Sequence, residues 1–175
     1  MNNGELTAEL ARRLTAKFMG RADILFDHGD PERDGRDKVG VIRSWFGDKL
    51  TRESLLADLD IAVILPQSNR VLLLIEIEES AANPKTILGD IFAAWLGEHF
   101  TFQGKRDLEA GKWTTLIVLS HGNPRDKLIA FLTDKVSRFK SVCLNKVVVE
   151  TFESEADLEE KLIQQIKFAL GNLKS

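Results

Sequence analysis

Cysteine, histidine and long apolar runs are all scarce in this sequence. The single cysteine, Cys143, excludes an internal disulfide, and the three scattered histidines leave no Cys/His spacing for a zinc site. No apolar run approaches the roughly 18 residues that a membrane-spanning helix needs, and residues 1–13 lack the apolar region of a signal peptide. We therefore expect a cytoplasmic protein that does not enter a membrane.

Glycine-rich phosphate loops and low-complexity tracts are also missing. Neither GxxxxGK(S/T) nor GxGxxG occurs, which argues against the nucleotide-binding enzymes that use those loops. At 175 residues, with 43% apolar and 29% charged residues, the chain has the composition of one globular domain, residues 1–175.

The formal net charge of −3 does not by itself indicate a nucleic-acid partner, but the charges are unevenly spread. Residues 51–100 carry eight acids against three bases, whereas residues 101–146 carry nine bases against four acids. A basic segment beside an acidic pocket suits a metal-dependent enzyme that acts on a polyanion, because cations hold phosphates while carboxylates hold the metal. Two ordinary solvated helix faces explain these counts equally well.

Four carboxylates lie on two neighbouring apolar segments that read as the strands of a hairpin. A turn centred on Ser68 places Asp60 opposite Glu76, and the same register places Asp58 opposite Glu78. Because strand side chains alternate, all four then project from one face. Clustered negative charge on an apolar sheet needs a cation or shared protons, so all four are candidate ligands of a hard divalent ion, Mg²⁺ or Mn²⁺. The alternative is that these acids occupy solvated strand ends.

The order of apolar patterns predicts an α/β fold with a central mixed sheet flanked by helices. Asn-Pro pairs that begin at Asn83 and Asn123 mark two helix starts. The hairpin should pair antiparallel, and the later strands should add in parallel through right-handed crossovers. The expected helices cover residues 6–18, 39–50, 83–102, 123–139 and 154–169, and the expected strands cover 55–65, 70–78, 112–120 and 145–152.

Together these features resemble the PD-(D/E)xK nuclease superfamily, which has the restriction-endonuclease-like fold. The resemblance is carried by an apolar strand that Asp60 leads, a turn, a second apolar strand that ends in Glu76-Ile77-Glu78, and a following helix and strand. It covers about residues 50–120. It implies that Asp60 and Glu76 coordinate magnesium and that the main-chain carbonyl of Ile77 adds a ligand.

The resemblance is incomplete at two positions. Leu59 stands where the family has proline, which is a common change, and Glu78 stands where the family has the lysine that helps to activate the attacking water. Three explanations stay open. Glu78 binds a second metal or takes the proton of the water, or Lys85 reaches back from the first turn of the next helix, or activity has been lost.

The resemblance implies a metal-dependent nuclease that hydrolyses phosphodiester bonds, with DNA rather than RNA as the expected partner. The catalytic candidates are Asp60, Glu76, Glu78 and Lys85. The alternative is a non-catalytic nuclease-like module that binds nucleic acid or another protein, and a homodimer is left open. The family also tends to place an acid from its first helix in the site, which indicates Glu9, or Glu53 if the acid comes from just ahead of the hairpin. For Glu9, a simple helical contact with Arg13 is the stronger explanation.

Overall fold

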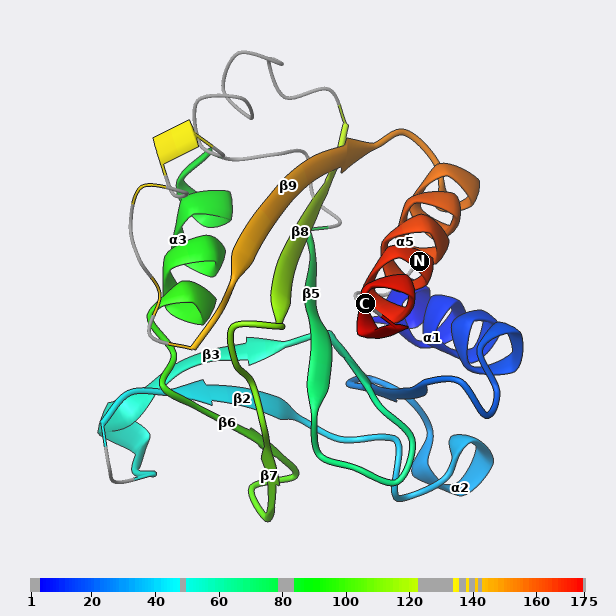
Figure 1. Cartoon of the computed structure of the whole chain (residues 1–175), viewed down its shortest axis with the longest axis horizontal. Helices are drawn as coiled ribbons and strands as arrows, with labels where there is room; N and C mark the ends of the chain where they lie inside the picture. Colours follow the sequence, from blue (N-terminus) through cyan, green and yellow to red (C-terminus); the bar gives the residue numbers. More distant parts are fainter. Residues whose placement is uncertain are drawn as a thin grey trace.

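The computed structural model of the chain is a mixed α/β fold with two β-sheets and helices packed against them (Figure 1). It describes residues 4–47, 50–78, 84–122, 134–135, 138, 141 and 143–174. Among these residues we find no helix with the length and hydrophobicity of a membrane-spanning segment.

The main sheet has five strands in the order β1-β4-β5-β8-β9. The pairs β1–β4 and β4–β5 are antiparallel, and the pairs β5–β8 and β8–β9 are parallel. The prediction of an antiparallel hairpin followed by parallel strands is therefore confirmed for this sheet. The strand bounds are β1 Asp23–Phe26, β4 Ile61–Ile64, β5 Val71–Glu78, β8 Thr115–His121 and β9 Lys146–Phe152.

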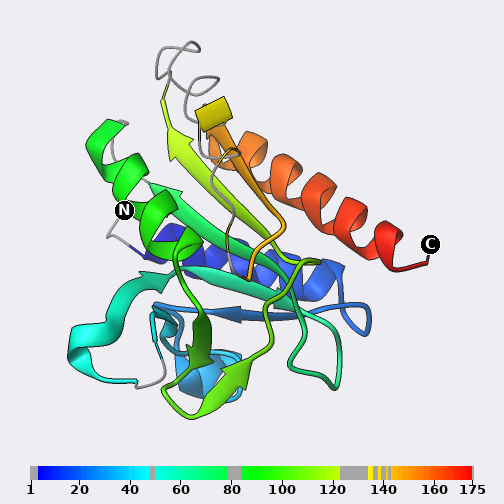
Figure 2. The same cartoon turned by 60° about the vertical axis from the view of Figure 1, so that its left-hand side comes forward.

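Helices cover both faces of the main sheet. α1 (Glu5–Lys17) and α5 (Glu155–Gly171) pack together on one face, and α3 (Pro84–Trp95) covers the other (Figures 1 and 2). The apolar core is divided in the same way, because the side chains of each strand alternate between the two faces. Short helical turns lie at α2 (Pro31–Asp34), η1 (Arg52–Ser54) and η2 (Asn172–Lys174).

The first and last helices follow their sequence signals closely. In α1 the leucines at four-residue spacing, Leu6, Leu10 and Leu14, are all buried. At the start of α5, the Ser154 hydroxyl accepts a hydrogen bond from the Asp157 N–H at 3.2 Å, as expected of an N-cap.

The second sheet has four antiparallel strands in the order β3-β2-β6-β7, and sequence reasoning missed it. Its bounds are β3 Leu55–Leu59, β2 Ile42–Trp45, β6 His99–Phe102 and β7 Arg106–Leu108. The prediction of a helix at 39–50 is wrong, because these residues lie between two partner strands and alternate in burial at Ile42, Arg43 and Ser44. Pairing across the sheet, rather than local propensity, decides this segment.

Two other expected elements change their bounds. The helix predicted at 83–102 ends at Trp95, and residues 99–102, which were expected to be its last turn, form β6 instead. Between the two elements, Gly97 packs directly against the Ser44 side chain. The strand predicted at 55–65 is broken at Asp60, with β3 in the second sheet and β4 in the main sheet. The helix predicted at 123–139 falls mostly outside the described residues.

Candidate functional site

The hairpin of the main sheet has the register expected from a turn at Ser68. Ile61 pairs with Ile75, and Val63 pairs with Leu73. A bulge after Val63 shifts the pairing only beyond that point, next to the turn. Asp60 immediately precedes β4, and Glu76 follows Ile75 in β5, so the same register continued by one step places the two acids opposite each other.

Asp60 lies at the bend where the chain passes from the second sheet into the main sheet. Its main-chain carbonyl accepts a hydrogen bond from the Asp27 N–H at 2.9 Å, and its Oδ2 accepts one from the Ile77 N–H at 2.7 Å. Because β3 leaves the main sheet at this point, no main-chain carbonyl of the described neighbouring strands is in place to accept from the Ile77 N–H. The Asp60 carboxylate accepts this hydrogen bond instead. A charge-assisted bond of this kind holds the carboxylate firmly beside the end of β5.

Glu76 and Glu78 project from the last residues of β5 toward the layer that contains α3. Both are half-buried, and Oε2 of Glu76 is buried. The parallel register places Val118 of β8 beside Glu76 and Ser120 beside Glu78, and paired residues share a face. Because Val118 packs in the core that α3 covers, both glutamates start from the same face.

Ser120 is a site residue that sequence reasoning missed. It is fully buried, and its hydroxyl has no hydrogen-bond partner among the described atoms. A buried polar group without a partner is costly, so its place beside Glu78 suggests a use in the site. The available signal was a hydroxyl directly after the apolar run in residues 116–119.

The predicted position of Asp58 opposite Glu78 is wrong. Asp58 lies on β3 of the second sheet, opposite Arg43, and its Oδ1 is 3.1 Å from Arg43 Nε. The bend at Asp60 moves the preceding residues to another sheet, so the expected alternation along one strand does not hold. With half of its side chain exposed, the ion pair of Asp58 is a surface contact that contributes at most about 1 kcal/mol.

Lys85 is exposed in the first turn of α3. This turn is at the same end of the main sheet as the last residues of β5 (Figure 1). Farther along, Ile87 and Ile91 pack in the core on the face that carries Glu76. The helix start is therefore on the side of the site, as the migrated-lysine explanation requires.

The two candidate acids outside the hairpin differ in position. Glu53 lies in η1 with its pKa lowered by a hydrogen bond with the Thr51 side chain, and the five extended residues of β3 separate it from Asp60. Five strand residues span roughly 16 Å, so Glu53 does not join the site.

Glu9 lies on α1, which begins near the site. It contacts Arg13 at 3.5 Å, the helical contact that its spacing suggests, and it lines an open hollow of about 430 Å³ together with Glu5 and His28. His28 packs against Gly4 at the start of α1 and follows Asp27, whose N–H binds the Asp60 carbonyl. The start of α1 therefore lies near the main chain of Asp60, but α1 packs on the face of the main sheet opposite to the one that carries Glu76.

The described residues contain no group of three or more His, Cys, Asp or Glu side chains that could hold a metal ion. The expected cluster of four carboxylates is thus not formed in this part of the chain, and Asp58 is the member clearly removed from it. Asp60 and Glu76 remain, next to the main chain of Ile77. Two carboxylates with main-chain oxygen fit Mg²⁺, which keeps several waters and typically takes only one or two carboxylates from a protein.

Comparisons with protein-family models, with curated proteins and with solved structures find no match. The function of the chain therefore has to be inferred from its own residues.

Proposed function

We propose that the chain is a metal-dependent nuclease domain with a PD-(D/E)xK-type site, and that it hydrolyses phosphodiester bonds in nucleic acid, DNA rather than RNA. The observation that carries this proposal is the Asp60 carboxylate, held by the Ile77 N–H in the position beside Glu76. The element order supports it, since the antiparallel β4–β5 hairpin is followed by α3 and the parallel β8, which is the order on which the resemblance rests. The site also lies at the carboxyl ends of parallel strands, where open α/β sheets bind ligands.

Asp60, Glu76 and the Ile77 carbonyl would hold Mg²⁺ or Mn²⁺, with Glu78 as a further ligand. When bound, such an ion lowers the pKa of a water and stabilises the leaving oxygen. The protein holds Asp60 in place through the main chain of β5, and it keeps Glu76 partly away from solvent. Both effects reduce the reorganisation that ion binding requires.

Some of the basic residues at 101–146, which were expected to hold the substrate, are already engaged in contacts within the protein. Arg106 donates to Asn69 Oδ1 and to the Ser68 carbonyl, both at 2.8 Å, and Lys112 donates to the Ser141 carbonyl. These two side chains therefore stabilise turns of the protein. Arg138 and Lys135 are paired with Asp134, at 2.8 and 3.9 Å, which leaves Lys105 and Lys146 as described candidates, whereas Arg125, Lys127 and Lys140 fall outside the described residues.

The sharpest test compares two aspartates that stand two residues apart. Asp60→Asn keeps an oxygen for the Ile77 N–H but loses the charge, so we expect Mn²⁺ affinity to fall at least about tenfold and cleavage by about a hundredfold or more. Asp58→Asn removes the same charge from the second sheet and should change neither. Calorimetric Mn²⁺ titration and cleavage of mixed DNA and RNA substrates measure both. Equal losses in the two variants would contradict the site.

The missing lysine gives a second comparison. If Lys85 assists the water, Lys85→Ala lowers turnover by orders of magnitude and leaves metal affinity unchanged. If Glu78 is a metal ligand, Glu78→Gln lowers metal affinity and turnover together, and Lys85→Ala is nearly silent.

A non-catalytic module that binds nucleic acid or protein is the second candidate. It is favoured by the glutamate at the position of the family lysine and by the lack of a three-carboxylate group in the described residues. Wild-type protein that binds DNA but neither cleaves it nor binds Mn²⁺ would establish this function in place of the nuclease.

A further inference from the structure

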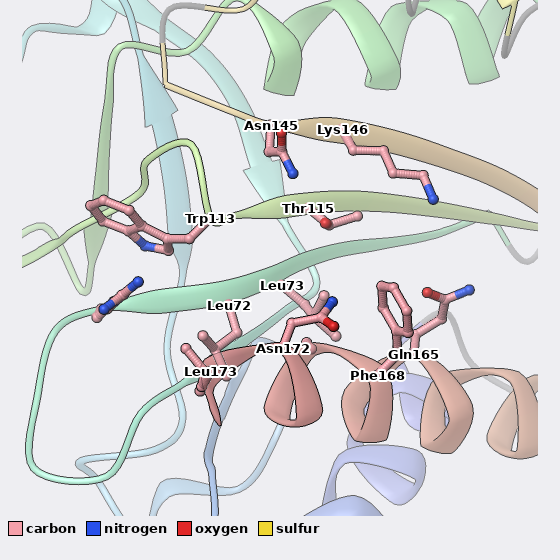
Figure 3. Close-up of a pocket in the computed structure, with 12 residues that line it drawn as sticks. Leu72, Leu73, Trp113, Thr115, Asn145, Lys146, Gln165, Phe168, Asn172 and Leu173 are labelled. Atoms are coloured by element: carbon pink, nitrogen blue, oxygen red, sulfur yellow. The ribbon is translucent and has the colours of Figure 1, made fainter. Parts of the chain in front are cut away.

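A second pocket lies at the end of the main sheet opposite to the carboxylate site. It is formed between the first residues of the parallel strands and the last turns of α5 (Figure 3). Its volume is about 260 Å³. Leu73, Thr115 and Lys146 line it from three neighbouring strands and pair with one another across the sheet. Glu78 follows Leu73 by five steps along β5, so the pocket is roughly 16 Å from the carboxylate site.

The pocket wall is cationic in a chain whose net charge is negative. Arg70 and Lys146 line it, and no carboxylate is among its lining residues, all of which the structure describes. Neither cation forms an ion pair with any described carboxylate. A pocket with two cations and no acid attracts an anion.

The Arg70 side chain is held in place by an aromatic ring and is partly desolvated. Its guanidinium lies over the Trp113 ring, 4.4 Å from the ring centroid, and that ring rests on Gly111. Its Nε is buried and has no hydrogen-bond acceptor among the described atoms. Because Nε is buried, the guanidinium is partly desolvated, and a phosphate in the pocket would bind its terminal nitrogens, whose planar geometry suits that group.

An exposed aromatic ring lines the end of the pocket away from Arg70. The Phe168 side chain is 65% exposed, although it lines the pocket. Figure 3 places it at the opposite end of the pocket from Trp113, with the Lys146 side chain extending toward the same end. An exposed ring beside a cation is the arrangement with which proteins stack nucleic-acid bases.

We propose that this pocket binds a nucleotide, with its phosphate on Arg70 and its base against Phe168. The pocket is smaller than the roughly 300–1,000 Å³ of drug-sized sites, so one nucleotide fits better than a dinucleotide. A free nucleotide and the phosphorylated end of a strand share this chemistry. The inference does not depend on the nuclease proposal, because no residue is common to the two sites.

One feature of the pocket opposes anion binding. The C-terminal end of α5 contributes Asn172 to the wall, and a helix C-terminus carries about half a negative elementary charge. Figure 3 places Asn172 and Leu173 on the Trp113 side of Phe168, so this partial charge lies toward the end where Arg70 stacks on Trp113. The whole positive charge of Arg70 outweighs it there, and the uncharged base lies toward Phe168.

Tryptophan fluorescence reports on this pocket directly. Trp113 is 44% exposed, whereas Trp45 and Trp95 are 7% and 3% exposed and face the core. Adenosine monophosphate should therefore change the emission of Trp113 in a saturable way, with excitation at the red edge of the indole band to avoid absorption by the base. Adenosine and inorganic phosphate should each bind at least tenfold more weakly, since each lacks half of the contacts. No saturable change with adenosine monophosphate would overturn the proposal.

Variants separate specific binding from general attraction. Arg70→Ala, Lys146→Gln and Phe168→Ala should each weaken binding about tenfold or more, and exposed Phe168 can be removed without loss of the fold. Lys167→Gln is the matched control, because this lysine is exposed on α5 but does not line the pocket. Calorimetric titration is the readout for all of these variants. Equal weakening by Lys167→Gln would overturn the proposal.

A 5′-phosphorylated oligothymidylate distinguishes the two sources of the ligand. Tenfold tighter binding than adenosine monophosphate, lost in the same variants, identifies a strand end, and equal or weaker binding identifies a free nucleotide. Asp60→Asn should leave these affinities unchanged, so failure of the nuclease site and failure of this pocket are measured separately.

Discussion

At the scale of single residues, acids that look alike in the sequence have different roles. Asp58 forms a surface ion pair with Arg43 in the second sheet, whereas Asp60 accepts a main-chain hydrogen bond in the main sheet. Their periodicity predicts that they are equivalent. The difference depends on where the chain changes sheets, which no local pattern indicates.

Ser120 provides a test of whether stability and function conflict at the site. Its buried hydroxyl makes no hydrogen bond within the described structure, so Ser120→Ala should leave the free energy of unfolding unchanged or raise it by about 1 kcal/mol. Ser141→Ala is the matched control, since that buried hydroxyl donates to the Trp95 carbonyl at 2.8 Å and should cost about 1–3 kcal/mol. Urea denaturation measures both variants. A similar loss in both would show that Ser120 has a structural partner.

The Arg12–Asp34 pair predicts a contribution to stability that depends on pH. Two hydrogen bonds of 2.8 Å from Arg12 lower the pKa of Asp34 in the folded state. A lowered folded pKa means that the contribution is complete above the unfolded pKa of about 4 and is lost as the pH falls through the folded pKa. Asp34→Asn should therefore destabilise the protein by roughly 1–3 kcal/mol at pH 7 and much less near pH 2. Denaturant titrations at the two pH values test this, and a difference that does not change with pH would contradict it.

At the scale of elements, the sequence predicts those that depend on local signals. α1 and α5 are confirmed because a buried leucine stripe and a serine N-cap operate within one helix. The main-sheet hairpin register is confirmed because its turn is short. β2 and β6 were missed because each of these short strands is stabilised mainly by partners distant in sequence. Without β2 as a partner for β3, there was no reason in the sequence to expect the strand to break at Asp60.

A buried hydrogen bond between β2 and β6 tests this account of the second sheet. Trp45 Nε1 donates to Thr101 Oγ1 at 2.9 Å, and both residues are buried. Trp45→Phe should cost roughly 1–3 kcal/mol through lost packing and an unpaired Thr101 hydroxyl. Adding Thr101→Val to it should cost less than the sum of the two single changes, because the unpaired hydroxyl is then removed. Strict additivity in urea denaturation would show that the bond contributes nothing.

At the scale of the whole molecule, the two ends of the main sheet carry opposite charge. Carboxylates gather where β5 ends, whereas Arg70 and Lys146 line the pocket where the parallel strands begin. The net charge of −3 does not reveal this separation of negative and positive side chains between the two ends of the sheet. A polyanionic substrate would be repelled by the carboxylates until a divalent ion neutralises them, so the proposed nuclease needs its metal for binding as well as for chemistry.

This requirement links metal binding to the stability of the whole fold, because Asp60 lies where the two sheets join. An ion that binds only the folded state should add about 2.7 kcal/mol at a concentration one hundred times its Kd. For a chain of 175 residues this corresponds to a rise in Tm of roughly 5–10 °C. Asp60→Asn should abolish the rise with Mn²⁺ and leave the Tm in chelator unchanged or slightly higher, since one of two neighbouring negative charges is gone. Asp58→Asn should keep the full rise. Scanning calorimetry in Mn²⁺ and in chelator measures each Tm, and a wild-type Tm that does not respond to Mn²⁺ would count against a metal site and favour the non-catalytic module.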